Sequence, residues 1–160
     1  MITVELDHQR VQEVLRRVKW AVGDLAPLMR GIAAEFASIT EENLEDQGQS
    51  GNAWPTLSSV TTAIREAAGT WPGQMLQVSA GGLAASVTTH ADNSSALVGS
   101  NKPYAAMMHF GGDKEAFAHL WGDIPARPYL PMDADGKLQP EAGDAILDLA
   151  LAHLEKAARL

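Results

Sequence analysis

Residues 102–130 constrain the fold of this 160-residue chain more than any other stretch. A short apolar run, long enough for a turn or two of helix, stops at the pair Gly111–Gly112. Further on, Pro125 and Pro128 fix their own φ angles and push the residue before each of them toward an extended backbone. Arg127 therefore lies on a stiff segment, which favours an anchored ion pair over a solvated charge. The stretch indicates a fixed contact surface rather than a site of catalytic turnover.

Length and net charge limit the classes of protein to which this chain can belong. A chain of this size is expected to form one domain over residues 1–160 and to bury roughly 70% of its unfolded surface. The formal net charge of -8 repels a phosphate backbone, so we expect no direct, sequence-specific contact with nucleic acid. The same repulsion would suit a passage through which DNA slides.

The chain has no cysteine, which excludes disulfides, thiolate zinc sites and cysteine nucleophiles. Charged residues are scattered through the first 20 positions, so no signal peptide is expected there. Nowhere do about 18 apolar residues run without a charge, so no membrane span is expected either. We expect a soluble protein that is intracellular when it is made.

Hydrophobic periodicity predicts an α+β fold. The expected elements, in order, are a strand at 2–6, helices at 8–23 and 25–47, a loop at 49–53, a helix at 57–67, a hairpin at 83–99, a short helix before Gly111, an extended segment around 125–130 and a helix from Pro140. Asp24 is placed to cap the second helix. Because helices and strands do not alternate, we expect a small antiparallel sheet, made of the N-terminal strand and the hairpin, with helices over one face.

The residues that could carry chemistry form no recognisable site. The nearest approach to a metal cluster is His109, Asp113 and His119, and no two histidines have the spacing of a helical zinc motif. No serine lies in a Gly-x-Ser-x-Gly elbow, and no Gly-Lys-Ser/Thr follows a glycine pair. We therefore predict no catalytic, cofactor-binding or metal-binding residues.

Aromatic and methionine side chains in the predicted loops could either cover the core or form an interface. Trp54, Trp71 and Trp121 lie beside proline or glycine, and such residues more often cover a core than anchor an interface. The same preference applies to Met107–Met108 and Phe110, for which we expect a core position first and a contact surface second.

Five short motifs occur in a fixed order over roughly residues 35–132: Trp54-Pro55-Thr56-Leu57 with Thr61; Met75-Leu76 to Leu83-Ala84-Ala85-Ser86-Val87; Val98-Gly99-Ser100 with Tyr104-Ala105; His109-Phe110-Gly111; and Ile124-Pro125-Ala126-Arg127-Pro128-Tyr129-Leu130. Together they resemble the phage virion morphogenesis, or tail completion, family of Mu-like prophages. The chain departs from that pattern at Met107–Met108, at Tyr129 in place of phenylalanine, and at 69–74, which lacks the usual basic residues.

The resemblance implies a small α+β structural subunit that assembles as a ring of copies. Such a protein would complete or terminate the tail, or join it to the head, with tail tube or head connector subunits as partners. It would be found in the host cytoplasm during assembly and then in the virion. The candidate subunit-contact residues are Tyr104, His109, Phe110, Arg127 and Tyr129.

Several alternatives stay open from sequence alone. Arg127 could pair inside its own subunit and brace the loop 111–123, or it could reach a neighbour. The edges of the 83–99 hairpin could accept a strand from another chain. Cations of the first helix are expected to pair with Glu13 and nearby acidic residues rather than to bind DNA. A soluble acidic binding or toxin-neutralising module is the other class considered, and a hydrolase is a distant third.

Overall fold

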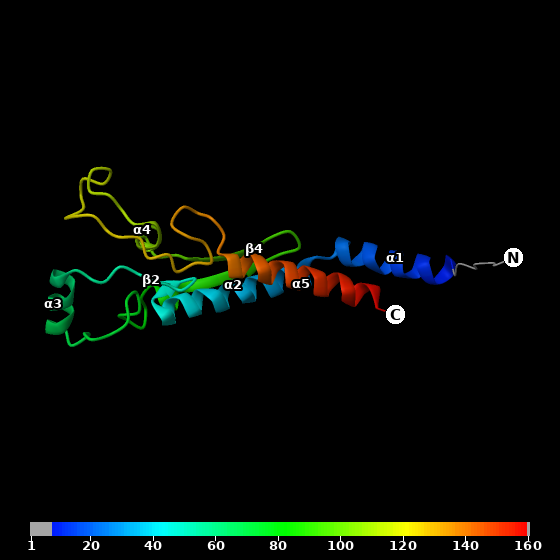
Figure 1. The fold of residues 1–160 in the computed structure, drawn as a ribbon, viewed down its shortest axis with the longest axis horizontal. Helices are drawn as coiled ribbons and strands as arrows, with labels where there is room; N and C mark the ends of the chain where they lie inside the picture. Colours follow the sequence, from blue (N-terminus) through cyan, green and yellow to red (C-terminus); the bar gives the residue numbers. More distant parts are fainter. Residues whose placement is uncertain (1–7, 160) are drawn as a thin grey trace.

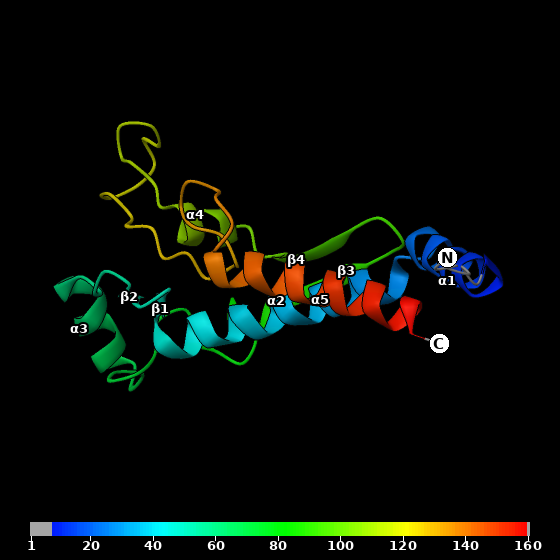
Figure 2. The ribbon, with the colours of Figure 1, turned by 45° about the vertical axis from the view of Figure 1, so that its right-hand side comes forward.

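The computed structural model describes residues 8–159, and the strand predicted at 2–6 lies outside them. Within that range the fold is α+β, as predicted. The elements are α1 (His8–Gly23), α2 (Ala26–Asp46), β1 (Gly48–Gln49), β2 (Asn52–Ala53), α3 (Ser59–Ala67), a 3-10 turn (Ala84–Ser86), β3 (Val87–Ala91), β4 (Ala96–Ser100), α4 (Ala105–Phe110) and α5 (Pro140–Ala158). The molecule is elongated, with α1 at one end and α3 at the other (Figures 1 and 2).

The break between α1 and α2 is capped from a distant part of the chain. The side-chain oxygen of Asn93 accepts hydrogen bonds from the backbone N–H groups of Leu25, at 2.7 Å, and Ala26, at 3.0 Å. Asp24 was the expected cap, but Leu25 occupies that position and the Asp24 carboxylate reaches only the Ala26 N–H, at 3.3 Å. The prediction fails because the turn of the hairpin supplies a better-placed acceptor than the preceding residue.

The β3–β4 hairpin lies on α2, and the two strands pair antiparallel from Val87 with Ser100 to Ala91 with Ala96. At its turn, hydrogen bonds from Ser94 and Ser95 lower the pKa of the Asp92 carboxyl to about 2. The hairpin was predicted, but its first strand starts four residues later than expected because residues 84–86 form a 3-10 turn. Within the described residues this sheet has two strands, so each keeps one unpaired edge.

Residues 48–53 are more ordered than the predicted loop. They form a tight hairpin in which Gly48 pairs with Ala53 and Gln49 with Asn52. Ser50 and Gly51 form its turn with φ values of 47° and 78°. Strands of two residues are too short to show an alternating pattern, which explains why the sequence indicated a loop.

The remaining helices begin and end close to where the sequence placed them. In α3 the Ser58 side chain accepts a hydrogen bond from the Thr61 N–H at 3.2 Å. Gly111 ends α4 with a φ of 77°, as the glycine pair predicted. Pro140 lies in the first turn of α5, which packs against both α1 and α2.

The core is small and lies at one part of the elongated molecule. Its buried cluster consists of Leu44, Trp54, Met75, Leu83, Ala105 and Tyr129. The accessible surface is 10861 Å². The unfolded chain of 17.0 kDa would expose about 25,000 Å², so folding buries ~55% of it rather than the predicted 70%. The shortfall follows from the shape, because the α1 end of the molecule extends away from the core (Figure 1).

Candidate functional site

Arg127 is held inside its own chain. Its side chain is 6% exposed, its Nε donates to the carbonyl oxygen of Pro55 at 3.1 Å, and its Nη2 donates to that of Thr56 at 3.1 Å. Burial lowers the pKa of this guanidinium. Of the two alternatives for Arg127, the structure shows the internal one, but the partners are backbone carbonyls of residues 55–56 rather than a carboxylate, and within the described residues no side-chain hydrogen bond to the loop 111–123 is present. The guanidinium binds two backbone dipoles and fixes the segment that leads into α3.

His109 lies behind the same segment and is 1% exposed. Its Nδ1 accepts hydrogen bonds from the N–H groups of Tyr129, at 3.3 Å, and Leu130, at 3.4 Å. An accepting Nδ1 requires the neutral ring with its proton on Nε2. Burial lowers the pKa of His109, and the backbone and charge of Asp133 oppose that shift in part. His109 therefore acts as a neutral brace for the extended backbone.

The carbonyl groups of the extended segment are also bound. The indole N–H of Trp54 donates to the Pro128 oxygen at 3.0 Å, and the Asn43 amide donates to the Tyr129 oxygen at 3.3 Å. The Gln49 amide donates to the Leu130 oxygen at 3.0 Å. Side chains from α2, β1 and the segment before α3 thus converge on three consecutive carbonyls.

Three side-chain amides form a connected network beside this segment. The Gln139 oxygen accepts from the Asn43 amide at 3.0 Å and from the Gln49 amide at 3.1 Å. We call Asn43, Gln49 and Gln139 the amide network. It ties the end of α2 to the start of α5 across more than 90 residues of sequence. Sequence reasoning missed it, because single Asn and Gln residues carry no pattern.

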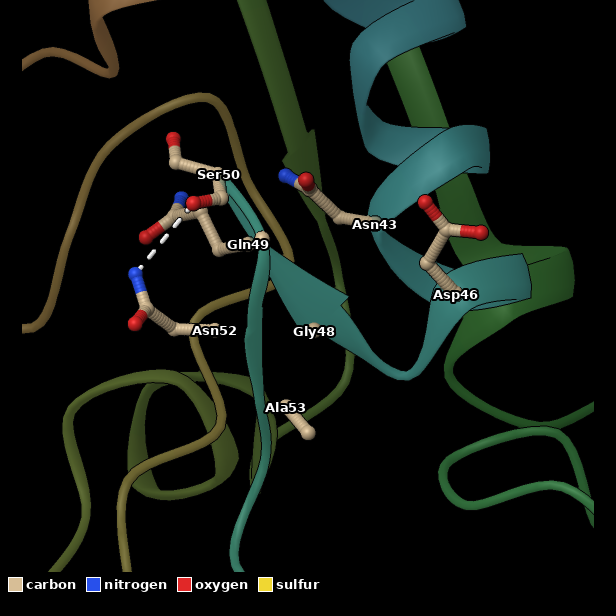
Figure 3. Close-up of a pocket in the computed structure, with 8 residues that line it drawn as sticks. Asn43, Asp46, Gly48, Gln49, Ser50, Asn52 and Ala53 are labelled. Atoms are coloured by element: carbon tan, nitrogen blue, oxygen red, sulfur yellow. Dashed lines mark hydrogen bonds between the residues drawn. The ribbon is translucent and has the colours of Figure 1, made fainter.

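A hollow of about 280 Å³ opens beside the amide network, between the end of α2 and the β1–β2 hairpin (Figure 3). Asp46 and Asn43 line its α2 side, and Ser50 and Asn52 lie on the hairpin. The Asn52 amide donates to the Ser50 carbonyl at 3.3 Å, and the Ser50 hydroxyl donates to the Glu141 carboxylate at 2.8 Å. The side chains of Asn43, Gln49, Ser50 and Asn52 are thus already hydrogen-bonded, mostly to residues outside the hollow. Among residues 8–159 no group of three or more His, Asp or Glu side chains is placed to hold a metal ion.

The five candidate contact residues divide into two sets. His109, Arg127 and Tyr129 are buried in the framework just described. Tyr104 is 46% exposed and Phe110 is 45% exposed, at the two ends of α4. The expectation that Phe110 belongs to the core is therefore wrong. That these five residues contact another subunit stays a prediction. Of the five, Tyr104 and Phe110 have side chains exposed enough to make such a contact.

A comparison with known sequence families identifies the family of this chain. The sequence model of the phage virion morphogenesis family matches residues 6–155. The chain belongs to that family. Of the residues in the quoted motifs, Trp54 and His109 bond to the extended segment 125–130, and Arg127 lies on it.

Named relatives of this family member agree with the assignment. It is 35% identical over 147 residues, 91% of each chain, to the "Putative capsid assembly protein G" of Escherichia phage Mu. It is 37% identical over 131 residues to the "Mu-like prophage FluMu G protein 2" of Haemophilus influenzae, covering 81% of this chain and 83% of the relative. No solved structure matches the chain. In the part of this family member that the structure describes, no helix is long and apolar enough to cross a membrane.

The surface of this family member carries large apolar side chains. Trp54 is buried, as predicted, but Trp121 is fully exposed in the loop 111–123. On α1 and α5, apolar side chains that recur at helical spacing face outward: Val11, Leu15, Val22, Leu147, Leu151 and Leu154 are all at least 40% exposed. Helical periodicity showed that these residues share a face, but it did not show whether that face has a partner in the same chain.

Proposed function

We propose that this chain is a non-enzymatic structural subunit that completes or terminates a phage tail, or joins it to the head, as part of a ring of copies. The observation that carries the proposal is the excess of exposed surface. A compact monomer of 17.0 kDa exposes about 7,700 Å², whereas this chain exposes 10861 Å². The eight residues outside the described range can account for at most about 1,300 Å² of the difference.

The remaining excess of accessible surface is about as large as the area that two neighbouring subunits would cover. A specific interface of standard size removes about 800 Å² from each partner, so two such interfaces remove about 1,600 Å² per subunit. A subunit in a ring has two neighbours and contacts them with two different patches. The surplus of more than about 1,800 Å² over a compact monomer supports that arrangement over a free-standing module.

The β3–β4 hairpin supplies one candidate patch for such a contact. Each of its strands has a free edge within the described residues, and the middle of β3 is exposed. A strand from another subunit could pair with such an edge through main-chain hydrogen bonds. Tyr104 and Phe110, exposed at the ends of α4, supply aromatic surface of the type enriched in interfaces.

The proposed partners are copies of this chain and the tail tube or head connector subunits. The relative from phage Mu is named for capsid assembly, which is consistent with a role in building the particle. Assembly would take place in the host cytoplasm and the product would stay in the virion. With a net charge of -8, a ring of this chain would let DNA slide through rather than hold it.

Electron microscopy of the purified chain, alone at high concentration and after addition to tails that lack it, tests the proposal. We expect annular particles or a ring at one end of the tail. Sedimentation velocity should show a species several times the mass of the 17.0 kDa subunit. A compact monomer in both conditions would contradict the proposal and favour the acidic binding module.

A further inference from the structure

The helix α1 extends beyond the rest of the molecule. Figure 1 shows α1 running past the C-terminal end of α5, toward the N-terminal end of the chain. Its last turns are packed: His153 bonds through Nε2 to the Ala21 carbonyl at 3.0 Å, and Val14 and Val18 are half-buried. Residues 11–13 are all exposed. A helix this short is marginal in water on its own, so the projecting turns need a partner.

The exposed apolar residues of α1 and α5 form one surface. On α1 the half-buried row Val14, Val18 and Ala21 is followed, one residue later, by exposed Leu15 and Val22. On α5 the half-buried row Ile146, Ala150 and His153 is likewise followed, one residue later, by exposed Leu147, Leu151 and Leu154. One residue is a rotation of about 100°. Because the two helices run in opposite directions (Figure 1), equal offsets place both exposed rows on the same side of the pair.

This surface carries a positive edge on an acidic chain. Arg16 and Lys19 are exposed and lie close to Leu15 along α1. Arg17 follows Arg16 in the same turn of the helix. Among residues 8–159, the one ion pair within 4 Å joins Arg159 to Glu155, so these cations have no carboxylate partner in the described chain. The apolar row with its positive edge therefore lacks both an apolar and an acidic partner.

The complementary surface lies toward the other end of the same chain. The last turns of α2 expose four carboxylates: Glu41, Glu42, Glu45 and Asp46. Beside them runs a groove of about 360 Å³ between α2 and β3 with a mixed lining: Ala37, Leu44, Ala84 and Val87 are apolar, whereas Thr40, Thr88, Thr89 and Glu41 are polar. Figure 2 shows this end of α2 far from α1, so one molecule cannot bring the two surfaces together.

We propose that α1 of one subunit packs into the α2–β3 groove of a second copy of this chain. Val11, Leu15 and Val22 would contact the apolar side of the groove, formed by Ala37, Ala84 and Val87, as the apolar face of an amphipathic helix does in a groove. Lys19 and Arg16 would face Glu41 and Glu45. This contact rests on the proposed ring, and it makes that ring head-to-tail, since two different patches of the same chain meet.

Site-directed cross-linking tests the contact on the full chain, which has no native cysteine. One preparation carries Leu15→Cys, and a second, size-tagged preparation carries Glu45→Cys; the two are mixed with a short bis-maleimide. We expect a mixed cross-linked dimer in at least tenfold excess over the matched control mixture, in which Lys137→Cys replaces Glu45→Cys. Lys137 is also exposed but lies outside the groove. Annular particles without this cross-link would overturn the α1 contact and leave the ring standing. A cross-link in chains that form pairs or open filaments would support the contact and overturn the ring.

Charge reversal gives a second, independent readout. Arg16→Glu with Lys19→Glu should weaken self-association by about tenfold or more, since like charges would then face each other. Glu41→Lys with Glu45→Lys, on the α2 surface that would receive α1, should weaken self-association by a similar factor. An equimolar mixture of the two variants should recover heterotypic association, whereas Lys137→Glu should leave association unchanged. Failure of the mixture to recover, or an equal loss with Lys137→Glu, would overturn the contact.

Discussion

The framework around residues 127–130 and the α1–α5 end of the molecule differ in how fully their polar and apolar groups are matched within one chain. Around residues 127–130, consecutive backbone groups bond to Asn43, Gln49, Trp54 and His109, and the aromatic ring of Tyr129 is 1% exposed. At the α1–α5 end, leucines up to 63% exposed face solvent, and Arg16, Arg17 and Lys19 of α1 form no ion pair within 4 Å in the described chain. Apart from the buried Nε2 of His109, which has no hydrogen-bond partner, the framework is satisfied within one chain, whereas the exposed rows of α1 and α5 are covered by nothing in the described chain. Substitutions should therefore act on stability in the framework and on assembly at the α1–α5 end.

Tyr129→Ala should show the largest loss of stability. Removing a fully buried aromatic ring from a core costs about 3–5 kcal/mol, and the ring also packs edge-to-face on His109 at 5.2 Å. Leu151→Ala, in the exposed row of α5, should change the stability of the monomer by less than about 0.5 kcal/mol. Urea unfolding of dilute protein measures both. Equal losses would remove the contrast between the two regions.

Arg127→Ala should cause the second largest loss of stability. We expect it to lower the free energy of unfolding by about 2–4 kcal/mol, because it deletes two charge-assisted hydrogen bonds and leaves two carbonyls unbound. Arg127→Lys keeps the charge but not the fork that reaches both the Pro55 and Thr56 oxygens, and it should recover part of that loss. Thermal melting of the monomer is the measurement. A normal melt combined with failed assembly would instead place Arg127 at an interface.

Disruption of the amide network should be milder. Asn43→Ala removes the donor to the Tyr129 carbonyl and leaves the Gln139 oxygen with one fewer partner, which should cost about 1–3 kcal/mol. Asn52→Ala, on the exposed side of the nearby hollow, is the matched control and should have little effect. If the two variants unfold at the same urea concentration, the network does not stabilise the fold.

The smallest expected effect is a dependence on pH. Because burial lowers the pKa of His109 in the fold, the unfolded chain binds a proton more readily than the native one. The contribution of His109 is therefore fully present above its unfolded pKa of about 6.5 and decreases as the pH falls below that value. His109→Gln should flatten this part of the stability profile. A profile that keeps its slope in the variant would assign the dependence to another group.

Much of the fold could be predicted, and the failures share a cause. Residues 105–110 and 140–158 were placed because glycine and proline mark helix ends through the local backbone. Asn93 as the cap of α2 and carbonyl oxygens as the partners of Arg127 could not be predicted, because both depend on contacts between segments about 70 residues apart. Apolar residues recur at helical spacing along both α1 and α5, which marks an apolar face on each helix. Whether such a face is covered by the same chain or by another is a property of the assembly, which sequence periodicity does not encode.

Hydrogen exchange of the α1 amides at different protein concentrations tests most directly whether a second chain covers this end of the molecule. In dilute solution the projecting first turns should exchange almost as fast as an unfolded peptide, while amides around residues 127–130 remain protected. Raising the concentration into the range where particles form should slow exchange in residues 9–16 and in the α2–β3 groove together. Protection of α1 that is the same at every concentration would contradict the proposed contact, because it would show that this helix is already complete in the single chain.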